Sequence, residues 1–288
     1  MTFALRQISV QFSTSEGAVT NLEGLRASIV TKNAGGEYPV AQLQMRIYGM
    51  TLDQMNQFSS NGANFVADQN LGVTVLAGDQ GSVLGQLFTG GIFSSYIDFG
   101  SIPDVGFVVA ARAGMYQQAN TVAPNSWQGT QNAEDLIASL TATLGSEWRF
   151  ENPQNAHAII QNQYVYGSAL NQIQKIIRVS NFASRIENNT ITIYPNDGAI
   201  DDVVIDVSPD NGLVGYPTYY ESGFIIRTEY NPDMLIGRTV NLTSQIPKAN
   251  GTWQIFDSTH ELSTLTPDGP WFTTVKLGAP GTNNVSEN

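Results

Sequence analysis

This 288-residue sequence contains two histidines, a residue type that often binds metals. His260-Glu261 begins like the His-Glu-x-x-His signature of zinc proteases, in which two histidines on one helix face bind the metal. The residue four positions after His260 is Thr264, however, and the other histidine, His157, lies far away in the sequence. Because His260 falls within a predicted strand, we interpret it as a hydrogen-bonded core or edge residue and not as a ligand.

Four acidic residues near the start of the last third of the chain raise the alternative of a calcium site: Asp197, Asp201, Asp202 and Asp206. An EF-hand loop needs a glycine at its sixth position and a glutamate at its end, and this spacing provides neither. We therefore interpret these residues as the exposed acidic edge of a strand.

Motifs for phosphate binding or nucleophilic catalysis are absent from the sequence. The glycine-rich run 78–91 lacks both the P-loop lysine and the G-x-G-x-x-G spacing, so it predicts tight turns. The chain has no cysteine, which excludes disulfides and thiolate metal sites. It has no G-x-S-x-G either, so few candidates for a nucleophile and its base are left. We expect no catalytic residue, no cofactor and no metal.

Three glutamates near Trp148 leave one enzymatic alternative open: Glu134, Glu147 and Glu151. Two carboxylates on either side of a bond can hydrolyse a glycoside, and their distance in space cannot be read from sequence. Glu134 is accounted for by the first turn of a predicted helix, and the other two flank a short predicted strand. We do not favour a catalytic pair, because no acid has an evident apolar environment suited to a proton donor.

Five aromatic residues in the last third suggest a second alternative, a platform for a glycan: Trp253, Trp271, Tyr216, Tyr219 and Tyr220. Each tryptophan opens a predicted strand whose later residues alternate, which favours packing inside a core. Burial explains GYPTYYES less well, so we interpret Tyr216, Tyr219 and Tyr220 as part of an exposed interface loop.

The composition limits the classes of partner. The net charge is -12, with only 13 Lys and Arg residues, whereas nucleic-acid binding needs a basic face that displaces counterions. We therefore expect no sequence-specific nucleic-acid partner. Only 13% of the residues are charged, and a surface of amides and hydroxyls is easier to desolvate than a charged one. This favours a protein packed against neighbours, although a β-rich surface with many loops explains it equally well.

The chain shows no targeting or membrane signal. Its start, MTFALRQISV, lacks the positive region and long apolar core of a secretory signal. The apolar stretches are short and interrupted, so we expect folding in the cytoplasm and no stable membrane insertion.

Alternating residues in the first part of the chain predict an antiparallel sheet or barrel. Strands are expected at 3–13, 41–49, 72–76, 83–88, 92–99 and 106–113, and Thr51 is placed to cap a short helix, LDQMNQF. Residues 116–131 lack periodicity and are interpreted as a connector.

The middle part changes to helical periodicity. Asn132 precedes a helix that ends before Gly145, a second helix is expected from about Ser168 to Ser180, and a hairpin follows with its turn at Asn188-Asn189. From residue 201 the chain returns to strands: DDVVIDV, GFIIRTEY, IGRTVNL, GTWQIFDSTHELST and PWFTTVKLG.

The sequence thus predicts a mainly β protein with a small α+β section, in which two antiparallel β-barrel domains flank an α+β insert. We place an N-terminal β-barrel domain at 1–115, an α+β domain at 116–200, a C-terminal β-barrel domain at 201–280 and a disordered tail at 281–288. No clear internal sequence repeat accompanies the two β units.

The final part of the chain resembles baseplate hub proteins of contractile-tailed, Mu-like bacteriophages. The similarity lies in an ordered series within residues 212–278: a Gly-Tyr-Pro bend, a strand before Asn-Pro, an Ile-Gly-Arg turn, Gly-x-Trp, a His-Glu-Leu-Ser strand and a Pro-Asp-Gly-Pro-Trp turn. YPVAQLQMRIYGMTLDQMNQFS is similar to the strand and short helix of the same family, so the resemblance spans nearly the whole chain.

The resemblance implies a structural protein of the virion tail baseplate, assembled in the host cytoplasm. In such hubs two barrels like those of the tail tube occur in each subunit, and a homotrimer presents six of them to the tail tube protein and three-fold features to the central spike protein. Other baseplate proteins are further implied partners, and DNA passes through the channel. Some hubs carry a fused lytic domain, and we expect no lytic activity here. A carbohydrate-binding β module and a cell-wall hydrolase remain the alternatives.

Overall fold

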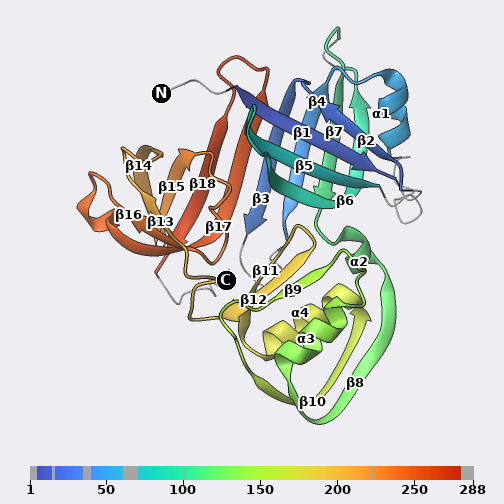
Figure 1. Ribbon diagram of the computed structural model, residues 1–288, viewed down its shortest axis with the longest axis vertical. Helices are drawn as coiled ribbons and strands as arrows, with labels where there is room; N and C mark the ends of the chain where they lie inside the picture. The colour runs from blue at the N-terminus through green and yellow to red at the C-terminus, as the bar shows by residue number, and fades with distance from the viewer. Residues whose placement is uncertain are drawn as a thin grey trace.

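The computed structural model describes residues 5–14, 17–34, 40–60, 71–100, 102–221 and 223–279. Strands dominate, and most of the helical residues gather in the middle of the chain (Figure 1). The predicted mainly β fold with a small α+β section is therefore confirmed. The predicted tail at 281–288 lies outside the described residues. Among the described helices, none combines the length and the apolar character that a membrane crossing requires.

The described residues of the N-terminal part form seven strands and one helix. They are β1 (Arg6–Ser13), β2 (Val19–Glu23), β3 (Ala27–Ala34), β4 (Gln42–Tyr48), α1 (Leu52–Phe58), β5 (Gly72–Asp79), β6 (Gly85–Asp98) and β7 (Gly106–Arg112). The two strands expected at 83–88 and 92–99 are one long strand, β6, with a bulge between Ile92 and Ser94. All the strand pairs of this part are antiparallel.

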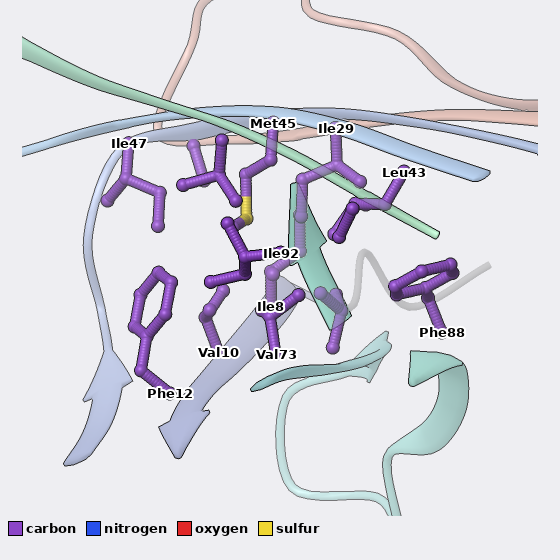
Figure 2. Packing of buried hydrophobic residues seen from close by; sticks show 14 of the residues in the cluster. Ile8, Val10, Phe12, Ile29, Leu43, Met45, Ile47, Val73, Phe88 and Ile92 are labelled. Atoms are coloured by element: carbon purple, nitrogen blue, oxygen red, sulfur yellow. The ribbon is translucent and has the colours of Figure 1, made fainter. Parts of the chain in front are cut away.

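The apolar sides of these strands face one another across a shared core (Figure 2). The alternation predicted for β1 and β4 is confirmed, because their apolar residues point inward. Phe12 is fully buried in this core, with its ring 4.7 Å from the ring of Phe58 and 6.1 Å from that of Phe107. Phe12 therefore fixes β1 against both α1 and β7. The Thr51 cap is also confirmed, since its hydroxyl accepts a hydrogen bond from the Gln54 amide at 3.2 Å.

The middle part is built from three helices and five strands. They are α2 (Met115–Ala119), β8 (Thr121–Asn132), α3 (Ala133–Thr141), β9 (Arg149–Glu151), β10 (Ile159–Ser168), α4 (Ala169–Val179), β11 (Phe182–Glu187) and β12 (Thr190–Pro195). The connector predicted at 116–131 is wrong: α2 and β8 occupy it. Strand β8 pairs only with β10 and is exposed along most of its length, so it lacks the alternation that marks a half-buried strand.

The predicted helices and hairpin of the middle part are confirmed. Helices α3 and α4 bury one apolar face each in a second core, and the Ser168 hydroxyl accepts a hydrogen bond from the Asn171 amide at 3.2 Å. Asn188 and Asn189 take φ values of 50° and 57°, the left-handed pair that a two-residue turn between β11 and β12 requires.

The C-terminal part adds six strands and a third core. They are β13 (Val204–Val207), β14 (Leu213–Tyr220), β15 (Gly223–Glu229), β16 (Thr239–Leu242), β17 (Gly251–Thr264) and β18 (Trp271–Gly278), with a short 3₁₀ helix at Pro247–Ala249. Strand β13 pairs in parallel with β16, an arrangement without a counterpart among the described pairs of the N-terminal part.

The two β parts form one continuous open sheet. Its order is β14-β15-β18-β17-β3-β4-β7-β6-β5-β1-β2, with β13 and β16 branching from β17. Strand β17 pairs with β16 near its start and with β3 from Asp257 to Thr264, so it joins the two parts. The prediction of two barrels is not supported, because no barrel closes among the described strands. The domain boundaries stay a prediction.

Candidate assembly surfaces

The three tyrosines of the predicted interface lie on β14, at one end of the sheet. Tyr216 and Tyr219 are 66% and 62% exposed, and Tyr220 is half-buried. The segment is an edge strand and not a loop, because β14 pairs with β15 on one side. Its role as an interface stays a prediction.

A bulge sets the shape of this edge. The register between β14 and β15 shifts between Val214 and Thr218, and Gly215 takes a φ of 75° within that interval. Pro217 lies there as well and has no N–H to donate to another strand. A bulged edge with a proline resists the uncontrolled addition of strands. Partners that meet this edge would therefore contact side chains more than the backbone.

The tyrosines are held by contacts beneath them. The ring of Tyr219 lies 4.9 Å from that of Phe224, which in turn meets Trp253 at 4.9 Å. Trp253 donates from Nε1 to the Ala249 carbonyl oxygen at 2.8 Å. The Lys276 ammonium group lies 4.8 Å from the centre of the Tyr220 ring. The rings of Tyr219 and Tyr220 are thus held in place by packed neighbours.

The two tryptophans pack as the periodicity predicts. Trp271 is buried and its ring meets that of Tyr230 at 5.4 Å, while Trp253 is partly buried against the third core. Neither forms an exposed glycan platform on the described surface.

Other exposed aromatic residues were not predicted from the sequence. Tyr164 and Tyr166 lie on one side of β10, with their rings 6.0 Å apart and the Lys175 ammonium group 5.1 Å from the Tyr166 ring. Phe99 is 54% exposed beyond the end of β6. The alternation of Tyr164 and Tyr166 around the apolar Val165, which is buried, is the sequence feature that could have predicted these exposed rings.

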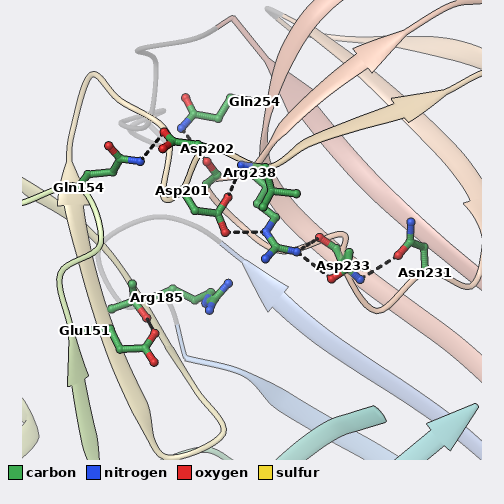
Figure 3. A network of polar contacts seen from close by, with 12 residues as sticks. Glu151, Gln154, Arg185, Asp201, Asp202, Asn231, Asp233, Arg238 and Gln254 are labelled. Carbon is green, nitrogen blue, oxygen red and sulfur yellow. Dashed lines mark hydrogen bonds and ion pairs between the residues drawn. The ribbon is translucent and has the colours of Figure 1, made fainter. Parts of the chain in front are cut away.

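Three of the four acidic residues considered for calcium, Asp201, Asp202 and Asp206, have separate partners. Figure 3 shows Arg238 between two aspartates: its Nε lies 2.8 Å from Asp201 Oδ2 and its Nη1 lies 2.9 Å from Asp233 Oδ1. Asp202 accepts from Gln154 Nε2 at 3.0 Å, and Asp206 accepts from Asn241 Nδ2 at 2.8 Å. Asp197 lies exposed in the turn after β12.

This network ties the end of the middle part to the C-terminal part. Arg238 precedes β16, whereas Asp201 follows the turn after β12, and Gln254 of β17 donates to the Gly198 carbonyl oxygen at 2.7 Å. Within the described ranges, no group of three or more His, Cys, Asp or Glu side chains gathers for a metal ion. The arrangement joins two parts of the chain and does not resemble a metal centre.

Two of the three glutamates, Glu134 and Glu151, form hydrogen bonds with neighbouring groups. Glu134 Oε1 lies 2.5 Å from His157 Nδ1, and Glu151 Oε2 accepts from the Thr192 hydroxyl at 3.4 Å. Glu147 lies beside Gly145 after α3. Burial would raise the pKa of Glu134, but its hydrogen bonds with His157 and the Ala158 amide hold that pKa below its usual value. A proton-donating acid needs the opposite shift.

His260 is a buried structural residue, as its place in a predicted strand suggested. Its Nδ1 lies 2.9 Å from the Thr273 hydroxyl, and its ring meets the Tyr230 ring edge-on at 5.6 Å. Burial lowers the pKa of His260 to about 4. The imidazole is therefore neutral in the folded protein at neutral pH.

We expect acid to destabilise the protein through His260. A histidine in the unfolded chain has a pKa of about 6.5. Between about pH 6.5 and 4, His260 is therefore protonated in the unfolded chain but not in the folded one. The folded pKa is lowered, so stability falls as the pH drops through this window, by about 2 kcal/mol at pH 5. Urea unfolding from pH 7 to pH 5 measures the loss. His260→Gln should flatten that part of the profile, and an unchanged slope would refute the assignment.

Comparisons with known proteins give one family match and several solved structures with a similar fold. The sequence model of a family described as "Baseplate hub gp41" matches residues 9–276. The 43 kDa tail protein of prophage MuSo2 from Shewanella oneidensis superposes with a TM-score of 0.65 at 8% identity, covering 96% of this chain and 98% of that chain. The tail protein from Neisseria meningitidis MC58 gives a TM-score of 0.64 at 10% identity, with 95% and 97% covered.

A third structure comes from a secretion system. The E. coli c3393 protein is described as a component of the type VI secretion system with structural similarity to the T4 bacteriophage tail proteins gp27 and gp5. It gives a TM-score of 0.57 at 11% identity and covers 90% of this chain and 74% of that chain. At such identities the likeness concerns the fold alone. Among curated protein sequences, no match is found.

Proposed function

Because the chain belongs to the Baseplate hub gp41 family, we propose that it adapts the tail tube of a contractile phage tail to the central spike. The family match over residues 9–276 is the observation that carries this function. The chain is a structural protein of the phage baseplate and a component of the virion tail. Association with other baseplate and spike proteins follows from that place.

We infer that the working form is a homotrimer. Each chain contributes two β parts, built around the first and third cores and joined through β3 and β17. Three copies around an axis then offer six β parts to a six-fold tube and three-fold features to a spike, because closed rings repeat their subunits by rotation. The open ends of the sheet at β14 and β2 support this proposal, since a subunit in a ring needs two different contact surfaces.

Solution mass tests the proposal directly. Light scattering should give three times 31.2 kDa, either for the chain alone or after a spike protein is added. A monomer under both conditions would argue against the homotrimer and leave the family assignment intact.

We propose that β14 forms part of the contact between subunits. Tyr216 stands out from an edge strand, and its hydroxyl makes only a 3.4 Å hydrogen bond to Gln245 Oε1. Tyr216→Lys is expected to raise the dissociation constant of the assembly by about tenfold or more, since exposed aromatics often dominate such contacts. Sedimentation at several concentrations measures this change.

A matched control is Tyr164→Lys on β10, where the tyrosine is 55% exposed and lies outside β14. Thermal unfolding should be similar for both variants, because neither ring is in a core. If Tyr164→Lys weakens the assembly and Tyr216→Lys does not, the contact is formed by the β8–β10 ribbon instead.

The acidic surface suits a channel for DNA. Between residues 201 and 279 the chain has ten acidic and four basic residues, and a homotrimer triples any net charge along its axis. A wall of like charge repels DNA and prevents sticking. Replacing channel-facing aspartates with lysine should slow genome ejection; unchanged kinetics would count against this role.

The enzymatic and glycan-binding alternatives have less support. We propose that the hub has no catalytic activity of its own and that it assembles in the host cytoplasm. Zymograms with bacterial cell wall and a glycan array test the two alternatives, and a cleared band or a bound glycan would revise the proposal.

A further inference from the structure

A small cavity with both polar and apolar walls lies where the three parts of the chain meet. Thr31 and Asn33 of β3 border it on one side, and Asn188 from the β11–β12 turn borders it on another. Tyr230, which follows β15, and His260 of β17 complete this part of the wall. The centres of water molecules can reach a volume of about 40 Å³ inside it.

Four polar atoms of this wall have no hydrogen-bond partner among the described residues: Thr31 Oγ1, Asn33 Oδ1, Asn188 Oδ1 and the Tyr230 hydroxyl. They make up half of the buried unpaired side-chain atoms found in the described part of the chain. Thr31 and Asn33 are only 5% and 8% exposed, so bulk water does not readily solvate them. Buried polar atoms almost always have a partner in folded proteins, so their gathering around one cavity points to a bound ligand.

The surrounding contacts define the chemistry of that ligand. Asn33 donates from Nδ2 to Glu187 Oε2 at 2.5 Å, which fixes the orientation of the amide and leaves Oδ1 as an acceptor. Glu187 Oε1 also faces Arg185 Nε at 3.2 Å, so this carboxylate is already neutralised. His260 is engaged with Thr273 and is neutral. The ligand must therefore donate to amide oxygens and exchange hydrogen bonds with two hydroxyls.

We propose that this cavity is a built site for ordered water that bridges Thr31, Asn33, Asn188 and Tyr230. One buried water needs about 10–15 Å³ of such space, so a volume of about 40 Å³ holds about three or four molecules. Each water makes two to four hydrogen bonds, which the four unpaired atoms and the neighbouring waters supply together. The bridge joins β3, the β11–β12 turn and the segment after β15, which belong to the three parts of the chain.

Two nearly isosteric substitutions test the proposal, because the presence or absence of water determines whether they lower or raise the equilibrium constant for folding. Thr31→Val and Tyr230→Phe each remove one unpaired hydroxyl with little change in shape. If water bridges these groups, each variant should lower the equilibrium constant for folding by about tenfold. If the cavity is dry, each variant removes an unsatisfied group and should raise that constant, which would overturn the proposal.

Two further variants separate water from side-chain packing. Thr141→Val is the matched control, because the Thr141 hydroxyl is buried and donates to the Ile137 carbonyl oxygen at 2.8 Å, so it calibrates the loss of a satisfied hydroxyl. The double variant Thr31→Val/Tyr230→Phe should cost less than the two single changes together, since both hydroxyls share the same waters. Full additivity would contradict a shared cluster.

A structure at a resolution that shows ordered water gives the direct readout. Density within hydrogen-bond distance of at least two of the four atoms supports the proposal. Density coordinated like a metal ion, or unfolding that depends on added sodium, potassium or calcium, would replace water by a cation. A cavity without density would overturn the proposal. None of these outcomes depends on the hub function, which the mass measurement tests separately.

Discussion

Replacing Phe12 with alanine is expected to lower the free energy of unfolding by about 3–5 kcal/mol. Phe12 is fully buried, stacks on Phe58 at 4.7 Å and meets Phe107 at 6.1 Å, so its loss leaves a cavity between β1, α1 and β7. Proteins of this kind retain only about 5–15 kcal/mol of net stability, so the variant should unfold at markedly lower urea concentration. Equilibrium urea unfolding followed by circular dichroism measures the change.

The same substitution at an exposed site provides the control. Phe99 is 54% exposed beyond β6, and Phe99→Ala should alter stability by about 0.5 kcal/mol or less. If the two variants lose equal stability, the first core is not organised around Phe12. If only Phe12→Ala loses stability, the measured difference reports the packing of that core.

The sequence was most informative where one face of an element is buried. Apolar alternation located β1 and β4, the Thr51 cap located α1, and the two asparagines located the β11–β12 turn. In each case the residue types follow from the local backbone structure. The element can therefore be predicted without knowing which other segment it packs against.

The sequence was least informative where burial does not follow that rule. Strand β3 points Thr31 and Asn33 inward together with Ile29, so its buried side does not read as apolar. Strand β8 is exposed on both sides and reads as a connector. The order of the sheet, and the continuity between β3 and β17, depend on pairs far apart in sequence, which periodicity does not encode. The pattern therefore suggested two barrels where the described strands form one open sheet.

The same reasoning applies to the candidate surfaces. The composition of GYPTYYES marked Tyr216 and Tyr219 as residues that burial does not explain, and they are exposed. Their place at an edge of the sheet became clear only with the pairing of β14 and β15. The partners of the acidic residues were equally invisible, because Arg238 meets Asp201 across 37 positions of the chain. The residue types suggested several roles for these side chains, and the tertiary contacts show which of them the structure supports.

Contacts between the parts of the chain differ in kind. The N-terminal and C-terminal parts share backbone pairing along β3 and β17, which resists relative movement. Polar contacts between the middle part and the C-terminal part include Gln154 with Asp202 and Gln254 with Gly198 (Figure 3). Next to these contacts, the backbone of Gly237 in the C-terminal part packs closely against the side chains of Tyr194 and Ile200.

Gly237→Ala is the second change with a large expected effect, a loss of about 2–5 kcal/mol in the free energy of unfolding. Gly237 takes a φ of 86°, which costs a residue with a Cβ about 1–2 kcal/mol. An added Cβ would also lie 2.8 Å from Tyr194 Cζ and 2.9 Å from Ile200 Cβ, and overpacking of this kind costs about 1–3 kcal/mol. Tyr194 and Ile200 are both buried, so neither can move aside easily.

Gly212→Ala separates the two contributions to that loss. Gly212 has a similar φ of 78°, but nothing lies within 4 Å of the place where its Cβ would be. It should lose only the backbone contribution of about 1–2 kcal/mol. Urea unfolding of both variants gives the difference, which measures how closely the Ile-Gly-Arg turn packs on Tyr194. Equal losses would mean that the turn stands away from the middle part. A larger loss for Gly237→Ala would mean that this glycine is required for the contact and not only for the turn.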